Sequence, residues 1–191
     1  MLDDIAEYNK EFEREKARVN GILAKGGDFP NDGKVDSEMR DLISNLNALP
    51  FLYSWSSCSG HFLTREDIFQ RVGHRNERLL QLPIEGHGFY FDGYLGLAFR
   101  PSTYTGECIS GITQIVERYP STSIDPWKPL IDTNLGELQG LRFEIKLDST
   151  QRGHPAVIPI KEGTKLRRVV NELIGDLNIL FSRYNSISQS E

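Results

Sequence analysis

The sequence of 191 residues has no long apolar run, few cysteines and no excess of basic residues. No stretch approaches the roughly 20 apolar residues of a membrane span, and the N-terminus lacks the pattern of a signal peptide. We therefore expect a cytoplasmic protein with no membrane partner, in which Cys58 and Cys108 are free thiols. The net charge of −5 argues against bulk, non-specific binding of nucleic acid.

Helical spacing of apolar residues is clear in three segments, 2–24, 36–49 and the stretch after Thr164. Asp36 and Thr164 are placed to cap the second and third of these helices. Apolar and aromatic runs predict strands at 51–56, 88–91, 94–99, 141–147 and 155–160, and a further helix is expected over 107–118.

The predicted architecture depends on the segments between these elements. Asp92-Gly93 separates two apolar runs, which is a strong hairpin signal. Residues 62–83 are partly helical and arginine-rich, whereas prolines make 120–136 loop-like. Helices interleaved with hairpins predict an α+β fold, with helices packed on a mixed β-sheet. Because no linker is visible, we predict one domain over 1–185 and a frayed tail at 186–191.

Three hydroxyls, a thiol and an imidazole occur together in one motif at the end of a predicted strand, Ser56-Ser57-Cys58-Ser59-Gly60-His61. Its hydroxyls can donate and accept hydrogen bonds, and its glycine allows close approach of the backbone. Such a loop can hold a phosphate or carboxylate with backbone N–H groups and side chains. The candidate ligand-binding residues for a small anionic ligand are therefore Ser56, Ser57, Cys58, Ser59, Gly60 and His61. A serine-rich structural turn is the alternative.

The same motif permits a second chemistry, because Cys58 could be a nucleophile with His61 as its base. A reactive thiol needs an electropositive setting, and Arg65 and Arg71 are the nearest sources of positive charge in the sequence. Cys58 and His61 are the candidate catalytic residues of this hypothesis. The chain has no dinucleotide-binding, P-loop or Gly-x-Ser-x-Gly motif in a supporting context, which disfavours those mechanisms.

A metal site is the third possibility for the motif. Cys58-x-x-His61 could supply two ligands of such a site. The residues considered to complete it are His87, His154 and Cys108, and none has paired ligand spacing. No metal is therefore predicted from the sequence.

Several strings in the first third of the chain share one order with a known family. A charged segment at 12–18 precedes Gly33-Lys34-Val35-Asp36, and a helix then ends in Leu-Pro at 49–50. Tyr53-Ser54-Trp55 follows and runs directly into Ser56-Ser57-Cys58-Ser59-Gly60. In this register the chain resembles the wybutosine-synthesising protein 3 family, whose members methylate a tricyclic guanosine derivative in tRNA with S-adenosylmethionine. Where that family usually continues with arginine, this chain has His61.

The resemblance implies a fold like that family's, S-adenosylmethionine as cofactor and tRNA as partner. The motif would then bind the methyl donor or orient the target base, a task of positioning. Tyr90 or Trp127 could stack a base. The implied contacts to tRNA phosphates are Arg71, Arg75 and Arg78, and a second basic cluster lies at 165–168.

Two hypotheses compete with this methyltransferase. One is a non-enzymatic module that holds a small anionic ligand or nucleotide in the motif. The other is the enzyme that depends on Cys58 and His61. The location of the site is common to all three hypotheses.

Overall fold

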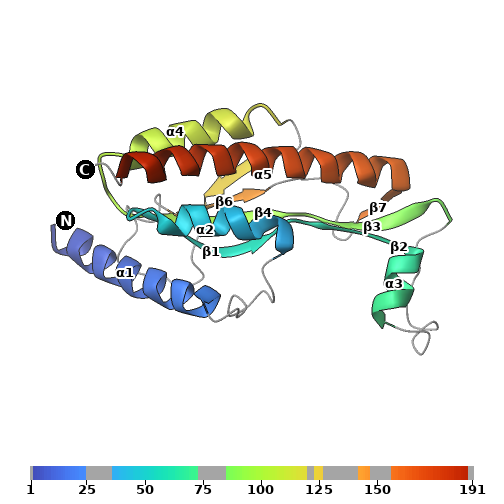
Figure 1. The fold of residues 1–191 in the computed structure, drawn as a ribbon, viewed down its shortest axis with the longest axis horizontal. Coiled ribbons are helices and arrows are strands. Elements are labelled where there is room, and N and C mark those ends of the chain that lie inside the picture. Colours follow the sequence, from blue (N-terminus) through green and yellow to red (C-terminus); the bar gives the residue numbers. More distant parts are fainter. Residues whose placement is uncertain are drawn as a thin grey trace.

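The computed structural model describes residues 2–24, 36–72, 85–119, 123–126, 142–146 and 156–188. Its helices and strands alternate along the chain (Figure 1). In order they are α1 (Leu2–Ala24), the short 3₁₀ helix η1 (Ser37–Met39), α2 (Arg40–Ala48), β1 (Leu52–Cys58), β2 (His61–Thr64), α3 (Arg65–Val72), β3 (His87–Phe91), β4 (Tyr94–Phe99), α4 (Thr105–Val116), β5 (Ser123–Pro126), β6 (Arg142–Lys146), β7 (Ala156–Pro159) and α5 (Ile160–Ser188).

One long antiparallel ladder forms the centre of the molecule. β1 pairs with β4 until Cys58 lies opposite Tyr94, and β2 then pairs with β3 from His61 opposite Phe91. The register is the same on both sides of this gap, so β1 and β2 continue one line of pairing along β4 and β3. The register shifts once, at a bulge between Ser54 and Ser56.

The outer strands divide this ladder into two sheets. One has the order β1-β4-β6-β5 and the other the order β2-β3-β7. The α+β prediction is confirmed, but every ladder in the described residues is antiparallel, where a mixed sheet was expected. The apolar pattern of a strand marks its buried face and not its direction, so it could not decide this point.

The predicted hairpin at Asp92-Gly93 is wrong. β3 and β4 do not pair with each other, because each pairs with the chain segment that holds β1 and β2. Asp92 and Gly93 therefore interrupt a nearly continuous line of strand instead of reversing it. The local signal for a turn was real, since the strand does break there, but the partner of each half is set by distant residues.

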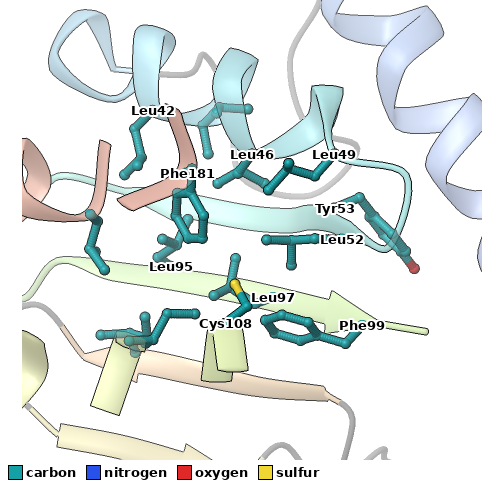
Figure 2. Close-up of a cluster of buried hydrophobic side chains, with 14 of the residues drawn as sticks. Leu42, Leu46, Leu49, Leu52, Tyr53, Leu95, Leu97, Phe99, Cys108 and Phe181 are labelled. Carbon is teal, nitrogen blue, oxygen red and sulfur yellow. The ribbon is translucent and has the colours of Figure 1, made fainter. Parts of the chain in front are cut away.

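Helices cover both faces of the four-stranded sheet. In Figure 1, α4 and α5 lie on one side of the strands and α1 lies on the other. Figure 2 shows side chains from α2 and α5 meeting those of β1 and β4, with Leu46 and Phe181 facing Leu52 and Leu97, all buried. On the opposite face of the sheet, Phe12 of α1 packs edge-on against Tyr53 of β1, with ring centroids 5.0 Å apart. This burial is the main source of stability.

Three predicted boundaries differ from the structure. α5 begins at Ile160, and the Thr164 hydroxyl donates a hydrogen bond to the Ile160 carbonyl (2.9 Å) instead of capping the helix. The helix continues to Ser188, and the Asn185 amide donates to the Asn45 carbonyl (2.7 Å), so the predicted tail begins too early. β5 lies in the segment that was predicted as loop. In the described part of the chain, no helix is long and apolar enough to cross a membrane.

Lys16 is a charged residue in the interface between α1 and β1. It is 9% exposed, and its ammonium donates hydrogen bonds to the carbonyls of Leu49 and Leu52. Burial lowers the pKa of Lys16 from 10.5 to about 8, and Arg100 acts in the same direction. Between these pH values the unfolded chain binds more protons than the folded one, so this group makes stability rise with pH.

We predict that wild type gains unfolding free energy relative to Lys16→Arg as the pH rises from 8 to 10, because the arginine cannot lose its charge there. Urea unfolding at several pH values measures the difference. The pKa of Cys108 is raised to about 12, which lowers stability above pH 9, but this contribution cancels between the two proteins. Lys10→Arg, at an exposed position of the same helix, is the control and should leave the slope unchanged. Equal slopes for wild type and Lys16→Arg would contradict the prediction.

Candidate functional site

The motif (residues 56–61) lies where the central ladder is interrupted. Residues up to Cys58 belong to β1 and His61 begins β2, so only Ser59 and Gly60 leave the strands. The motif is therefore mostly strand, whereas the sequence suggested a loop after a strand. The break faces a matching break at Asp92-Gly93 on the partner strands, so backbone groups of both segments are released from the ladder.

Two glycines allow these broken segments to pack closely. Gly60 has a φ of +79°, and a Cβ added there would lie 2.9 Å from the Phe91 carbonyl oxygen and 3.0 Å from the Gly93 nitrogen. A Cβ on Gly93 would lie 2.9 Å from the carbonyl carbon of Ser59. Such contacts involve backbone atoms, which cannot move aside as a side chain can. The close contact between the two strand breaks therefore requires glycine at both positions.

Asp36 fixes the break from outside the sheets. Its Oδ2 accepts hydrogen bonds from the Ser59 backbone N–H (2.7 Å) and from the Ser59 hydroxyl (2.9 Å). The residue precedes η1, but its side chain makes no capping hydrogen bond, contrary to the sequence prediction. The carboxylate that the motif can bind is thus supplied by the chain itself. The N–H and hydroxyl of Ser59 are not left for a small anionic ligand.

Cys58 and His61 stand beside this carboxylate. His61 Nε2 lies 3.7 Å from the second oxygen of Asp36, Oδ1, and 3.7 Å from Cys58 Sγ. The Gly60 backbone N–H donates to Cys58 Sγ at 3.4 Å. The side chain of His61 is 35% exposed and that of Asp36 is 18% exposed, so the cluster is open to solvent on one side.

The N-terminal part of α5 borders the site. Arg167 of α5 pairs with Glu38, two residues beyond Asp36, at 3.0 Å. The pKa of Glu38 lies below its ordinary range, chiefly because the carboxylate accepts a backbone hydrogen bond at Glu38, with smaller contributions from Ser37 and Arg167. The ring of Phe62 fits against Gly163 of α5, where a Cβ would lie 2.4 Å from it. These contacts fix α5 next to η1 and β2.

The structure brings together four of the six predicted motif residues and adds Asp36, whose role the sequence analysis missed. Ser59 binds the Asp36 carboxylate, Cys58 and His61 lie beside it, and Gly60 donates to Cys58 Sγ. Ser57 is 5% exposed, and its hydroxyl has no hydrogen-bond partner in the described part of the chain. The backbone of Ser56 is in β1, and its side chain lies outside the described features. The signal for Asp36 was its place in the 33–36 string of the family resemblance.

Other predicted residues lie elsewhere. His87 begins β3 opposite Pro159, at the end of that strand farthest from the motif, and its Nδ1 is 3.3 Å from the Glu85 carbonyl. Cys108 is buried in the core on α4, so it completes no site at the motif. Tyr90 is 1% exposed, which excludes it as a surface on which a base could stack.

The predicted phosphate contacts are largely untested. The backbone of Arg71 belongs to α3, and its side chain is not among the described features. Arg75 and Arg78 lie outside the described residues, as do Trp127, considered for base stacking, and His154, considered as a metal ligand.

A groove of about 480 Å³ lies between α4 and α5, away from the motif. Asp176 on its wall accepts a hydrogen bond from the Tyr119 hydroxyl (2.7 Å) and pairs with Arg118 (3.1 Å). Burial, together with the hydrogen bond to Asp176, raises the pKa of Tyr119 to about 12. The polar groups described on this wall are therefore paired with one another.

Comparison with known proteins gives only structural similarities. No family model and no curated protein matches the chain. It is similar to the PH1069 protein from Pyrococcus horikoshii, at 13% identity over 93% of this chain and 96% of that chain, with a TM-score of 0.46. A structure of PH1069 from strain OT3 has 13% identity, 94% coverage of each chain and a TM-score of 0.48. A hypothetical protein from Aeropyrum pernix has 13% identity over 81% of this chain and 98% of that chain, with a TM-score of 0.34.

We predict that Gly60→Ala destabilises the protein by about 2 to 3 kcal/mol, because the new Cβ combines a positive φ with a clash against backbone. Urea denaturation measures the loss. Gly106→Ala is the matched control, because a Cβ at this exposed position of α4 meets nothing within 4 Å. The control should be neutral or slightly stabilising. Equal unfolding free energies for both variants would show that the two strand breaks are not tightly packed at Gly60.

Proposed function

We propose that the protein is an S-adenosylmethionine-dependent methyltransferase that modifies a tricyclic guanosine derivative in tRNA, and that it acts in the cytoplasm. One observation carries the proposal. Asp36, which ends the 33–36 string, holds Ser59 of the motif through two hydrogen bonds. One residue from each of two strings of the family resemblance thus belongs to one site, although 23 residues separate these two side chains.

The charge of the site suits the proposed methyl donor. S-adenosylmethionine carries a positive sulfonium, an ammonium and ribose hydroxyls, all of which favour acceptor groups. Asp36 Oδ1 makes no hydrogen bond to the motif backbone and faces His61. The side chain of Asp36 is 18% exposed, so the carboxylate is partly open to solvent. Asp36 is therefore the group that would hold a positively charged part of the donor.

Bound S-adenosylmethionine would supply the methyl group, and the residues of the chain would provide positioning and proton transfer. The close packing at Gly60 and the Asp36 hydrogen bonds hold the motif in one conformation, which favours an in-line approach of the target nitrogen. A ring nitrogen that bears a hydrogen must also lose a proton when it is methylated. His61 Nε2 is partly exposed next to Asp36, so it is placed to accept that proton.

Basic residues of α5 favour a polyanionic substrate near this site. Lys165 and Arg168 are exposed on the same helix as Arg167, which reaches Glu38 beside the motif. They add positive charge to the exposed surface of this helix, where Arg168 also pairs with Glu172. Arg71, Arg75 and Arg78 remain predicted phosphate contacts from α3 onward.

The cysteine enzyme is less well supported by the same geometry. In a nucleophile–histidine–carboxylate triad, the carboxylate binds one ring nitrogen and the nucleophile contacts the other. Here Asp36 Oδ1 and Cys58 Sγ both lie 3.7 Å from the same nitrogen, His61 Nε2. The histidine is therefore not oriented by Asp36 as a base for Cys58.

We predict that the metal-free wild type binds S-adenosylmethionine in isothermal titration calorimetry and that Asp36→Asn weakens binding about tenfold, because it removes the negative charge that faces the donor. The variant should keep its melting temperature within a few degrees, because the asparagine oxygen can still accept the hydrogen bonds from Ser59. Ser110→Ala, at an exposed position of α4, is the control and should bind like wild type.

Transfer of a radiolabelled methyl group to tRNA that carries the unmethylated tricyclic base then tests the reaction itself. Absence of binding at millimolar S-adenosylmethionine would exclude the proposed cofactor. Binding without transfer to this tRNA would leave the cofactor in place and overturn the substrate.

A further inference from the structure

Three side chains of different chemistry converge at the break in the ladder. A carboxylate oxygen of Asp36, the thiol sulfur of Cys58 and a ring nitrogen of His61 all lie within 4.8 Å of one another. His61 Nε2 is 3.7 Å from Asp36 Oδ1 and 3.7 Å from Cys58 Sγ. A tetrahedral zinc ion with bonds of about 2.0 to 2.3 Å separates its ligand atoms by about 3.5 Å. Closing the three atoms on such an ion requires shifts of about an ångström.

The direction of the histidine ring distinguishes this cluster from a proton relay. Both neighbours of His61 approach the same nitrogen, so the lone pair of that nitrogen, the sulfur and the carboxylate oxygen can point to one common position. A relay would use the two ring nitrogens for different partners. Convergence on a shared point is the arrangement of metal ligands.

The surrounding hydrogen bonds prepare two of these atoms as ligands. Ser59 donates twice to Asp36 Oδ2, which fixes the carboxylate and leaves Oδ1 toward His61. The Gly60 N–H donates to Cys58 Sγ, which fixes the position of the sulfur. Outer hydrogen bonds of this kind orient metal ligands and tune their basicity. Among the described residues, no lysine or arginine forms an ion pair with Asp36 that would take the place of a cation.

We propose that Asp36, Cys58 and His61 bind a divalent transition metal of zinc type. One thiolate, one imidazole and one carboxylate match the preference of zinc for sulfur and nitrogen with a single oxygen ligand. Three protein ligands leave a fourth position, which is open to solvent because the side chain of His61 is 35% exposed. That position takes water or an oxygen or nitrogen atom of a bound molecule. A bound metal would occupy His61 Nε2 and Asp36 Oδ1, so the roles of these atoms in the methyltransferase proposal belong to the metal-free protein.

The sequence pattern Cys58-x-x-His61 does not predict a metal site by itself, because His87, His154 and Cys108 lack paired ligand spacing. The completing ligand is an aspartate 22 residues before Cys58, in a segment that precedes η1. From the sequence alone, an isolated aspartate before a helix is interpreted as the N-cap of that helix. Only the fold brings it to the cysteine and the histidine.

The test is a cobalt(II) titration of the full chain, without a polyhistidine tag and freed of metal with a chelator. Wild type should bind one equivalent, with a thiolate-to-cobalt absorption band in the near ultraviolet and the strong visible bands of a tetrahedral ion. Zinc should displace the cobalt and remove both signals. Cys58→Ser should lose the ultraviolet band, whereas Cys108→Ala, the control thiol buried on α4, should keep it.

Asp36→Asn and His61→Gln should each weaken cobalt binding at least tenfold. The asparagine can still accept hydrogen bonds from Ser59, and His61 is partly exposed, so neither variant should lose its fold. Melting of the metal-free variants checks this point. Ser59→Ala removes one hydrogen bond to Asp36 and no ligand, so it should weaken binding less than either ligand variant.

Three results would overturn the proposal. They are the absence of a thiolate band in wild type, a band that survives Cys58→Ser, and a titration that is unchanged in both Asp36→Asn and His61→Gln. If either Asp36→Asn or His61→Gln does not fold, the titrations of the other variant and of Cys58→Ser test the proposal. Failure of this test leaves the methyltransferase proposal intact, because calorimetry with S-adenosylmethionine is read on the metal-free protein.

Discussion

The hydrogen bonds between Asp36 and Ser59 are the interaction on which the rest of the site depends. The central ladder keeps one register from Cys58 to His61, yet Ser59 and Gly60 leave it. A released backbone N–H in a half-buried position needs an acceptor, and Asp36 supplies one. The same carboxylate is thereby held next to Cys58 and His61. A break in a strand, stabilised by an aspartate from another segment, thus becomes a site.

This internal carboxylate decides the electrostatic character of the motif. Serine hydroxyls and backbone N–H groups at the end of a strand are suited to binding an anion. Once Asp36 occupies that position, the remaining surface presents an acceptor oxygen, a thiol and an imidazole. The site therefore favours cations and hydrogen-bond donors. A sulfonium cofactor and a transition metal are two ligand types that suit such a site.

Rigid packing around the site comes from glycine and aromatic residues instead of a large local core. Gly60 and Gly93 bring two strand breaks into backbone contact, while Phe62 fits against Gly163 of α5. The main hydrophobic core lies between the four-stranded sheet and the helices packed on it, with Leu46 and Phe181 among its members. The buried polar side chains include Lys16, in the interface of α1, and Ser57, in the motif. The Lys16 ammonium has carbonyl partners although burial lowers its pKa, whereas the hydroxyl of Ser57 has no partner in the described residues.

The sequence by itself determined the helices α1, α2, α4 and α5, most of the strands, the α+β class and the position of the motif, because apolar spacing and the chemistry of residues 56–61 are local properties. It missed the strands β2 and β5. It could not determine that Asp92-Gly93 breaks a strand without reversing it, since a turn signal does not say which strands pair. Nor could it show that Asp36 binds Ser59 instead of capping η1, because both roles use the same carboxylate and only the distance to Ser59 separates them. The tertiary structure decided the partners. Contacts between residues far apart in the chain depend on how the sheets and α5 pack, and no local pattern records that packing.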